Sequence, residues 1–111
     1  MGLILGIAAA IAIGALIVWV VKLTISKLKD RIRELIKKKN AKKVVALKID
    51  KLIKECDNQI SIDDLDDYDM VIAAVDDNDQ VEEVQLVNDE GYGDPEVDRF
   101  LGDKDMVVVT G

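Results

Sequence analysis

The sequence has a single cysteine, Cys56, and no histidine among its 111 residues. One cysteine cannot form an intrachain disulfide, so a disulfide-stapled secreted scaffold is excluded. A reduced thiol is the interpretation we favour, while an intermolecular disulfide stays open. The lack of histidine removes the commonest general base and the commonest transition-metal ligand, and it leaves Cys56 without the partner that usually activates a nucleophilic thiol.

Other catalytic signatures are scarce too. Ser26 and Ser61 are the only serines, and Gly91-Tyr92-Gly93 is too short for a loop that cradles phosphates. Carboxylates are abundant but lie in predicted turns, where no apolar cleft is implied that would separate their pKa values. We therefore predict a protein that is not an enzyme and that binds no cofactor.

Charged side chains are absent before Lys22, and Leu3–Val21 is an uninterrupted apolar run of 19 residues. As a helix it would be about 28 Å long, close to the hydrocarbon thickness of a bilayer. A signal peptide would carry basic residues before the run and small residues at its end, whereas this run ends in Ile17–Val21. A buried helix is disfavoured because the remaining chain is too small to cover it. The run thus predicts a transmembrane helix over 3–21.

Basic residues follow this run at once, within the zone where positive charge sets membrane orientation. They predict a single-pass protein of a cell or virion membrane, with its N-terminus outside and its C-terminus in the cytoplasm or interior. Trp19 would then lie near the inner boundary of the bilayer. The basic residues expected at the membrane surface are Lys22, Lys27, Lys29, Arg31, Arg33, Lys37, Lys38 and Lys39.

Small residues recur every fourth position along the apolar run, at Gly2, Gly6, Ala10 and Gly14. Such a stripe lets two membrane helices approach closely, so one hypothesis is self-association of the span. The other is that glycine and alanine are simply common in membrane helices. The sequence leaves both open.

The segment 22–56 carries thirteen basic and four acidic residues, a net charge of +9. Ile25, Leu28, Ile32 and Leu35 alternate at spacings of three and four, which predicts an amphipathic helix that ends near Asn40. This stripe suits either a short coiled-coil stalk or a helix lying on anionic lipid. Without aromatic residues among the basic ones or any recognised motif, we expect no nucleic-acid binding.

Residues 41–56 are predicted to form a second amphipathic helix. Val45, Ile49, Leu52, Ile53 and Cys56 would share one face of it. Val45, Leu47 and Ile49 also alternate, so a strand remains an alternative.

The segment 57–111 has eighteen acidic and two basic residues, a net charge of −16. Gln59–Ile62 is a possible strand, and Met70–Val75 and Val81–Val87 on either side of Asp76–Asp79 predict a β-hairpin. Asp94, Pro95 and Gly102 match the start and end of a short helix. Met106–Thr110 is expected to be a final, central strand. We predict that this acidic unit packs against a basic helix, which would relieve its charge repulsion.

Two acidic clusters raise the hypothesis of calcium binding. An EF-hand-type loop needs a glycine at its sixth position and a glutamate at its twelfth, and neither cluster has them. Solvated turn carboxylates are the preferred interpretation, and no metal site is predicted. The clusters comprise Asp63, Asp64, Asp66, Asp67 and Asp69, and then Asp77 and Asp79.

Taken together, the sequence predicts a single-pass transmembrane helix (3–21), a basic amphipathic helical stalk (22–56) and a small acidic α+β domain (57–111). The leading hypothesis is a non-enzymatic structural or interaction protein, an oligomeric subunit of a membrane-associated assembly such as a virion, secretion or defence complex. The alternatives are a membrane-permeabilising or channel-like effector and a cation- or ligand-sensing membrane module. The expected partners are a bilayer with an anionic inner leaflet and either further copies of the chain or another membrane protein.

Overall fold

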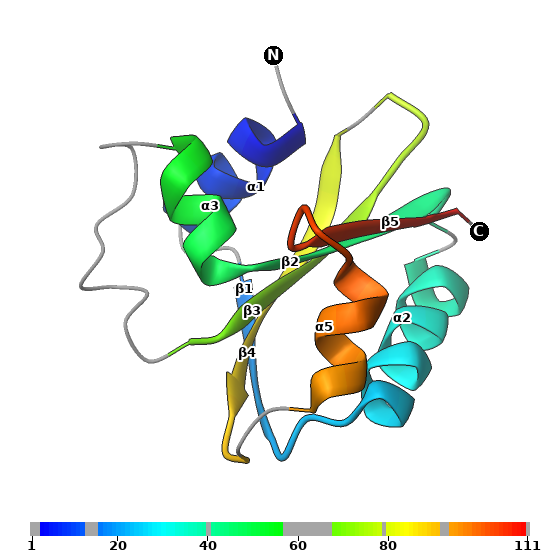
Figure 1. Ribbon diagram of the computed structural model, residues 1–111. Helices are drawn as coiled ribbons and strands as arrows, with labels where there is room; N and C mark the ends of the chain where they lie inside the picture. Colours follow the sequence, from blue (N-terminus) through cyan, green and yellow to red (C-terminus); the bar gives the residue numbers. More distant parts are fainter. Residues whose placement is uncertain are drawn as a thin grey trace.

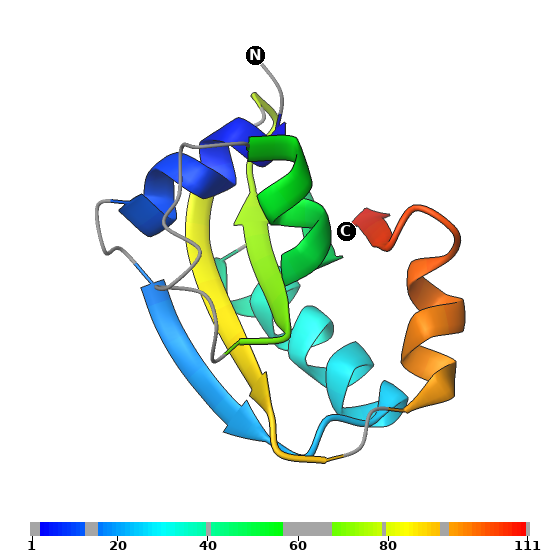
Figure 2. The ribbon, with the colours of Figure 1, turned by 60° about the vertical axis from the view of Figure 1, so that its left-hand side comes forward.

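The computed structural model describes residues 3–12, 16–39, 41–56, 68–78, 80–91 and 94–110. They form a five-stranded mixed sheet with helices on both faces, as the two views in Figures 1 and 2 show. Helices α1 and α3 lie on one face, and α2 and α5 lie on the other. In chain order the elements are α1 (Leu3–Ala12), β1 (Leu16–Val21), α2 (Ile25–Lys39), β2 (Lys43–Lys48), α3 (Ile49–Cys56), β3 (Met70–Val75), β4 (Val81–Asp89), α5 (Pro95–Leu101) and β5 (Met106–Thr110).

The strand order is β1-β4-β3-β2-β5. Strand β3 is at the centre, antiparallel to both β4 and β2, and all six of its residues are buried. A strand covered on both faces reads as a continuous apolar run, which accounts for its sequence MVIAAV. Because β1 is parallel to β4, the strands β1, β2 and β4 point in the same direction and end at the same edge of the sheet.

The first core layer lies between the sheet and helices α1 and α3. Ile7 and Ile11 are one helical turn apart in α1, and Leu52 faces the sheet from α3. Burying a side chain of this size stabilises the fold by about 1.5–3 kcal/mol. The buried residues of this layer are Ile7, Ala8, Ile11, Val45, Leu47, Ile49, Leu52, Val71, Ala73, Val75, Val84 and Leu86.

The second core layer lies under helices α2 and α5. Leu28, Ile32 and Leu35 are buried against the sheet, and Ile25 is half-buried at the start of α2. The predicted helix is confirmed, and its apolar stripe packs inside its own chain. The predicted packing of the basic helix on the acidic segment is confirmed as well, since α2 contacts both β3 and α5. The buried residues of this layer are Leu23, Leu28, Ile32, Leu35, Val44, Ala46, Met70, Ile72, Val87, Val97 and Leu101.

The predicted transmembrane helix over 3–21 is wrong. Leu3–Ala12 forms α1, whereas Leu16–Val21 forms a strand that pairs with β4. No helix in the described part of the chain has the length and apolar character needed to cross a membrane. The single-pass topology with an outside N-terminus and a cytoplasmic C-terminus is therefore wrong too. The prediction counted apolar residues and ignored that Ile17, Val18 and Val20 are β-branched, which favours a strand.

The predicted fold class is wrong in its division of the chain as well as in its anchor. The five strands of one sheet come from 3–21, 22–56 and 57–111 alike. The helix predicted over 41–56 forms only from Ile49 onward, because Lys43–Lys48 is strand β2, as the alternation of Val45 and Leu47 allowed.

Most of the helices and strands predicted within the acidic segment 57–111 are confirmed. The hairpin of β3 and β4 is confirmed, and so is α5 between its Asp94 cap and Gly102. The strand over Met106–Thr110 is confirmed, but it lies at the end of the strand order and not at the centre. The strand predicted over Gln59–Ile62 lies outside the described residues.

Candidate functional site

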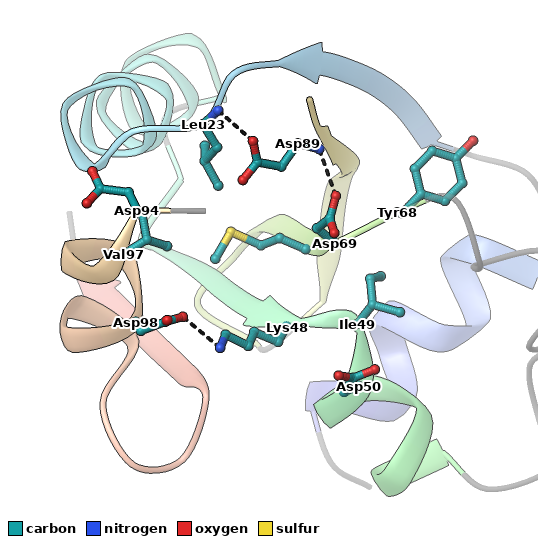
Figure 3. A pocket seen from close by; sticks show the side chains of 11 residues that line it. Leu23, Lys48, Ile49, Asp50, Tyr68, Asp69, Asp89, Asp94, Val97 and Asp98 are labelled. Carbon is teal, nitrogen blue, oxygen red and sulfur yellow. Dashed lines mark hydrogen bonds and ion pairs between the residues drawn. The ribbon is translucent and has the colours of Figure 1, made fainter. Parts of the chain in front are cut away.

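A pocket of about 280 Å³ lies at the edge of the sheet where β1, β2 and β4 end (Figure 3). This edge is where ligands bind in many α/β proteins, because side chains of several strands and loops converge there. The pocket is lined by Leu23, Lys48, Ile49, Asp50, Tyr68, Asp69, Met70, Asp89, Asp94, Val97 and Asp98.

Two of the carboxylates join the ends of neighbouring strands. The backbone N–H groups of Leu23 and Gly91 donate to Asp89 Oδ1 over 3.0 and 2.8 Å. The N–H of Asp89 in turn donates to Asp69 Oδ2 over 2.8 Å, as Figure 3 shows. The loop after β1, the end of β4 and the start of β3 are therefore held together by side chain to backbone hydrogen bonds.

Asp94 serves two helices at once. Its Oδ1 accepts a hydrogen bond from the N–H of Glu96 in α5, and its Oδ2 accepts one from the N–H of Ile25 at the start of α2. The nitrogen–oxygen distance is 3.0 Å in both. Helix N-termini carry unpaired N–H groups and a partial positive charge, so a carboxylate is favoured there. The hydrogen bonds from Glu96 and Ile25, with a smaller contribution from Arg99, lower the pKa of Asp94 below its ordinary value.

Lys48 is the cation of the pocket lining. Its Nζ lies 2.6 Å from Asp98 Oδ1 and 3.7 Å from Asp105 Oδ1, in the turn before β5. The hydrogen bond to Asp98 is the largest cause that raises the pKa of Lys48, and Asp105 adds to it against a smaller opposing effect of burial. Lys48 thereby connects β2 to α5 and to the start of β5.

These contacts define what the pocket can do. Four of its five aspartates already accept hydrogen bonds from backbone groups or from Lys48, namely Asp69, Asp89, Asp94 and Asp98. Within the described ranges no three His, Cys, Asp or Glu side chains are arranged to hold a metal ion. These four carboxylates already hold secondary-structure elements together through hydrogen bonds and an ion pair. We therefore look for the candidate site outside the pocket.

The predicted acidic clusters are only partly described. Asp69 belongs to the pocket lining, and Asp77 lies in the turn of the hairpin, where Asp76 Oδ1 accepts from the N–H groups of Asn78 and Gln80. The other members, Asp63, Asp64, Asp66, Asp67 and Asp79, lie outside the described residues.

Strand β1 is the second candidate. In the part of the chain that the structure describes it has a strand neighbour on one side only, β4. Its side chains are all uncharged, and Ile17, Val18 and Val20 are 42, 44 and 54% exposed. An edge strand offers unpaired N–H and C=O groups to another strand, and proteins usually blunt such edges with charges, proline or bulges. The described pairing of β1 with β4 runs through all six residues without a bulge.

Trp19 and Arg31 meet on the α2 face of β1. The Arg31 guanidinium lies 4.6 Å from the centre of the Trp19 ring, an attractive cation–π arrangement. Arg31 Nε also donates to Gln85 Oε1 over 2.7 Å, and Gln85, only 4% exposed, donates to Glu83. The predicted membrane-surface arginine and membrane-boundary tryptophan thus contact each other within the chain and link α2 to β1.

The other predicted site residues lie in separate parts of the structure. Gly6 and Ala10 lie in α1, where Ala10 packs on the first core layer and Gly6 approaches Val81 of β4; Gly2 and Gly14 lie outside the described residues. Lys39 is the last residue of α2. Lys29 lies 5.5 Å from the centre of the Phe100 ring, and Arg33 pairs with Asp30 at 3.2 Å. The remaining basic residues, Lys22, Lys27, Lys37 and Lys38, are exposed.

Comparison with known proteins produced no match to a family model, to a curated protein or to a solved structure, so function is inferred from this geometry. The sequence prediction missed β1 as a site because it assigned the same residues to lipid. The run of β-branched and aromatic residues from Ile17 to Val21 was the signal that could have revealed it.

Proposed function

We propose that this protein is a non-enzymatic interaction module that accepts an additional polypeptide strand along β1. The observation that carries the proposal is the combination of an open strand edge with exposed apolar side chains at Ile17, Val18 and Val20. In strand addition the backbone hydrogen bonds supply affinity, and alternate side chains supply specificity.

The opposite edge is a poorer acceptor. Strand β5 has five residues and follows the charged turn Asp103–Asp105. Of its side chains, Val107 and Val109 pack on the second core layer, and Val108 is 43% exposed. A strand arriving at β5 would have to lie against the three charged residues of that turn, whereas Lys22 is the one charged residue that directly adjoins β1 in the sequence.

The expected affinity is modest. Each backbone hydrogen bond adds a net contribution of about 0.5–1.5 kcal/mol. A six-residue edge gives an interface below the about 1,200 Å² of stable complexes, which places the Kd in the micromolar range.

Trp19 offers a direct test because it is the only tryptophan of the chain and lies on β1. We would titrate the full chain with an acetylated peptide of alternating threonine and valine between terminal lysines, and record Trp19 fluorescence. We expect a saturable change that Val20→Lys abolishes by placing a charge on the edge. Val108→Lys on β5 is the matched control and should leave the titration unchanged.

Two results would contradict the proposal. One is the absence of any change in Trp19 fluorescence at millimolar peptide. The other is an equal loss of binding in Val20→Lys and Val108→Lys, which would show that the peptide does not distinguish the two edges.

A further inference from the structure

We infer that the strand added at β1 is β1 of a second copy of this chain, paired antiparallel about a twofold axis. This inference rests on the proposed function and names its partner. It would join two five-stranded sheets into one continuous sheet, with α2 and α5 of both copies on the same face.

The backbone direction of β1 defines which residues can pair outward. The C=O of Val21 accepts from the N–H of Glu90 over 2.9 Å, so the backbone of Val21 faces β4. The N–H and C=O of one residue point to the same side of a strand, and the side alternates along it. The backbone N–H and C=O of Trp19 therefore face β4 as well, and those of Val18 and Val20 face outward.

This alternation restricts the register. Residues opposite each other in an antiparallel pair lie on the same face of the sheet, so an even-numbered residue must face an even-numbered one. With the twofold axis at Trp19, Val18 of one copy faces Val20 of the other, and both have outward backbone groups. Lys22 then faces Leu16 of the other copy, which extends the hydrogen-bonded ladder. A register with Val18 facing Val18 is shorter.

Side-chain chemistry favours a second copy over an unrelated strand. The exposed side chains of β1 are apolar and uncharged, so the best partner is an equally uncharged apolar strand, which β1 itself provides. Among the described strands, β5 of a second copy is the other uncharged candidate partner. A β1–β5 contact would be head-to-tail, so each added copy would leave one β1 and one β5 free to continue an open array. A β1–β1 contact closes after two copies.

The charges flanking β1 favour the antiparallel orientation. Lys22 is exposed just after the strand, and Glu82 is exposed at the beginning of the neighbouring β4. Leu16 pairs with Val84, two residues beyond Glu82, so antiparallel pairing brings Lys22 of each copy toward Glu82 of the other. Parallel pairing would instead place Lys22 beside Lys22.

Sedimentation velocity of the full chain from about 5 to about 500 µM, a range that brackets a micromolar Kd, tests the inference. We expect a monomer–dimer equilibrium for the natural sequence and for Val108→Lys. Val20→Lys should weaken it by about tenfold or more, because two like charges would enter each interface. Val18→Lys serves as a second variant if Val20→Lys does not fold, as judged by circular dichroism.

Disulfide trapping in a Cys56→Ser background tests the register. A mixture of Val18→Cys and Val20→Cys proteins should crosslink under mild oxidation, because their Cα atoms would be about 5.5 Å apart. Val18→Cys alone should crosslink far less. Efficient crosslinking of Val18→Cys alone would overturn the register at Trp19.

The outcomes separate the two proposals. A chain that stays monomeric at the highest concentration but binds the threonine–valine peptide would overturn the second-copy inference and leave strand addition standing. A monomer that binds no peptide would overturn both. A dimer that persists in Val20→Lys and Val18→Lys would place the interface elsewhere and overturn the inference.

Discussion

The two outer strands of this sheet, β1 and β5, meet solvent in different ways. β1 has six uncharged residues, and three of them are more than 40% exposed. β5 has five residues, begins at a charged turn and is tied to β2 through Lys48 and Asp105. Among the described residues, charged side chains therefore gather beside β5, whereas β1 keeps an apolar edge without a second strand neighbour, and such an edge is the kind to which another strand can add.

We expect the greatest loss of stability from a substitution in β3, the central strand of the sheet that carries both edge strands. Ile72 is fully buried in β3, and Ile72→Ala should lower the free energy of unfolding by about 2–5 kcal/mol through lost contacts and a cavity. Urea denaturation measures this. Val108→Ala is the control, because an exposed edge residue should change stability by about 0.5 kcal/mol or less. Equal effects of the two variants would mean that β3 is not the common support.

The next effect is specific to β1. Arg31→Ala removes the cation above Trp19 and leaves buried Gln85 without its donor, which should lower the free energy of unfolding by about 1–3 kcal/mol. Trp19 fluorescence should shift, and amide hydrogen exchange should speed up in β1 more than in β5. Arg33→Ala, whose Asp30 contact is exposed, is the matched control on the same helix. Uniform acceleration in both edge strands would show that Arg31 has no particular role at β1.

A smaller loss of stability is expected from a substitution at Gly102, in the turn between α5 and β5. Gly102 has φ of +76° and ψ of −171°, a conformation that side chains with a Cβ rarely adopt. Gly102→Ala should lower the free energy of unfolding by about 1–2 kcal/mol although its Cβ would meet nothing within 4 Å, so the cost is backbone strain. Thermal unfolding compares it with Gly6→Ala in α1, which should cost nothing because alanine favours helix. An unchanged Tm for Gly102→Ala would show that this turn relaxes freely.

The smallest effect concerns the tie between β2 and β5. Lys48→Met should lower the free energy of unfolding by about 0.5 kcal/mol, since the ion pairs of Lys48 are partly exposed. Because folding raises the pKa of Lys48 above 10.5, this stabilisation is complete below pH 10.5 and is lost as pH rises through the folded-state pKa. Unfolding at pH 7 and above pH 10.5 measures it, and a difference between the two proteins that grows with pH would refute the assignment.

The features that depend on neighbouring residues were predictable. The hairpin of β3 and β4 follows from two apolar runs around Asp76–Asp79, and α5 follows from Asp94, Pro95 and Gly102. The apolar stripe of α2 and its packing on the acidic segment were predictable too, but its packing on β2, whose residues were expected to form a helix, was not. None of the residues at the open edge was predicted as a site. Arg31 was expected at the membrane surface and instead lies over the ring of Trp19 in β1.

Local residues were enough to locate the short elements, because turn chemistry, helix caps and apolar periodicity act within a few residues. The conformation of Leu16–Val21 depends on contacts with distant residues, because an apolar run can satisfy its backbone hydrogen bonds as a helix in a bilayer or as a strand beside another strand. That partner strand, β4, pairs Val84 with Leu16 across more than sixty intervening residues. The pairing of β1 with β4 depends on how the rest of the sheet folds, so it could not be predicted from the apolar run alone.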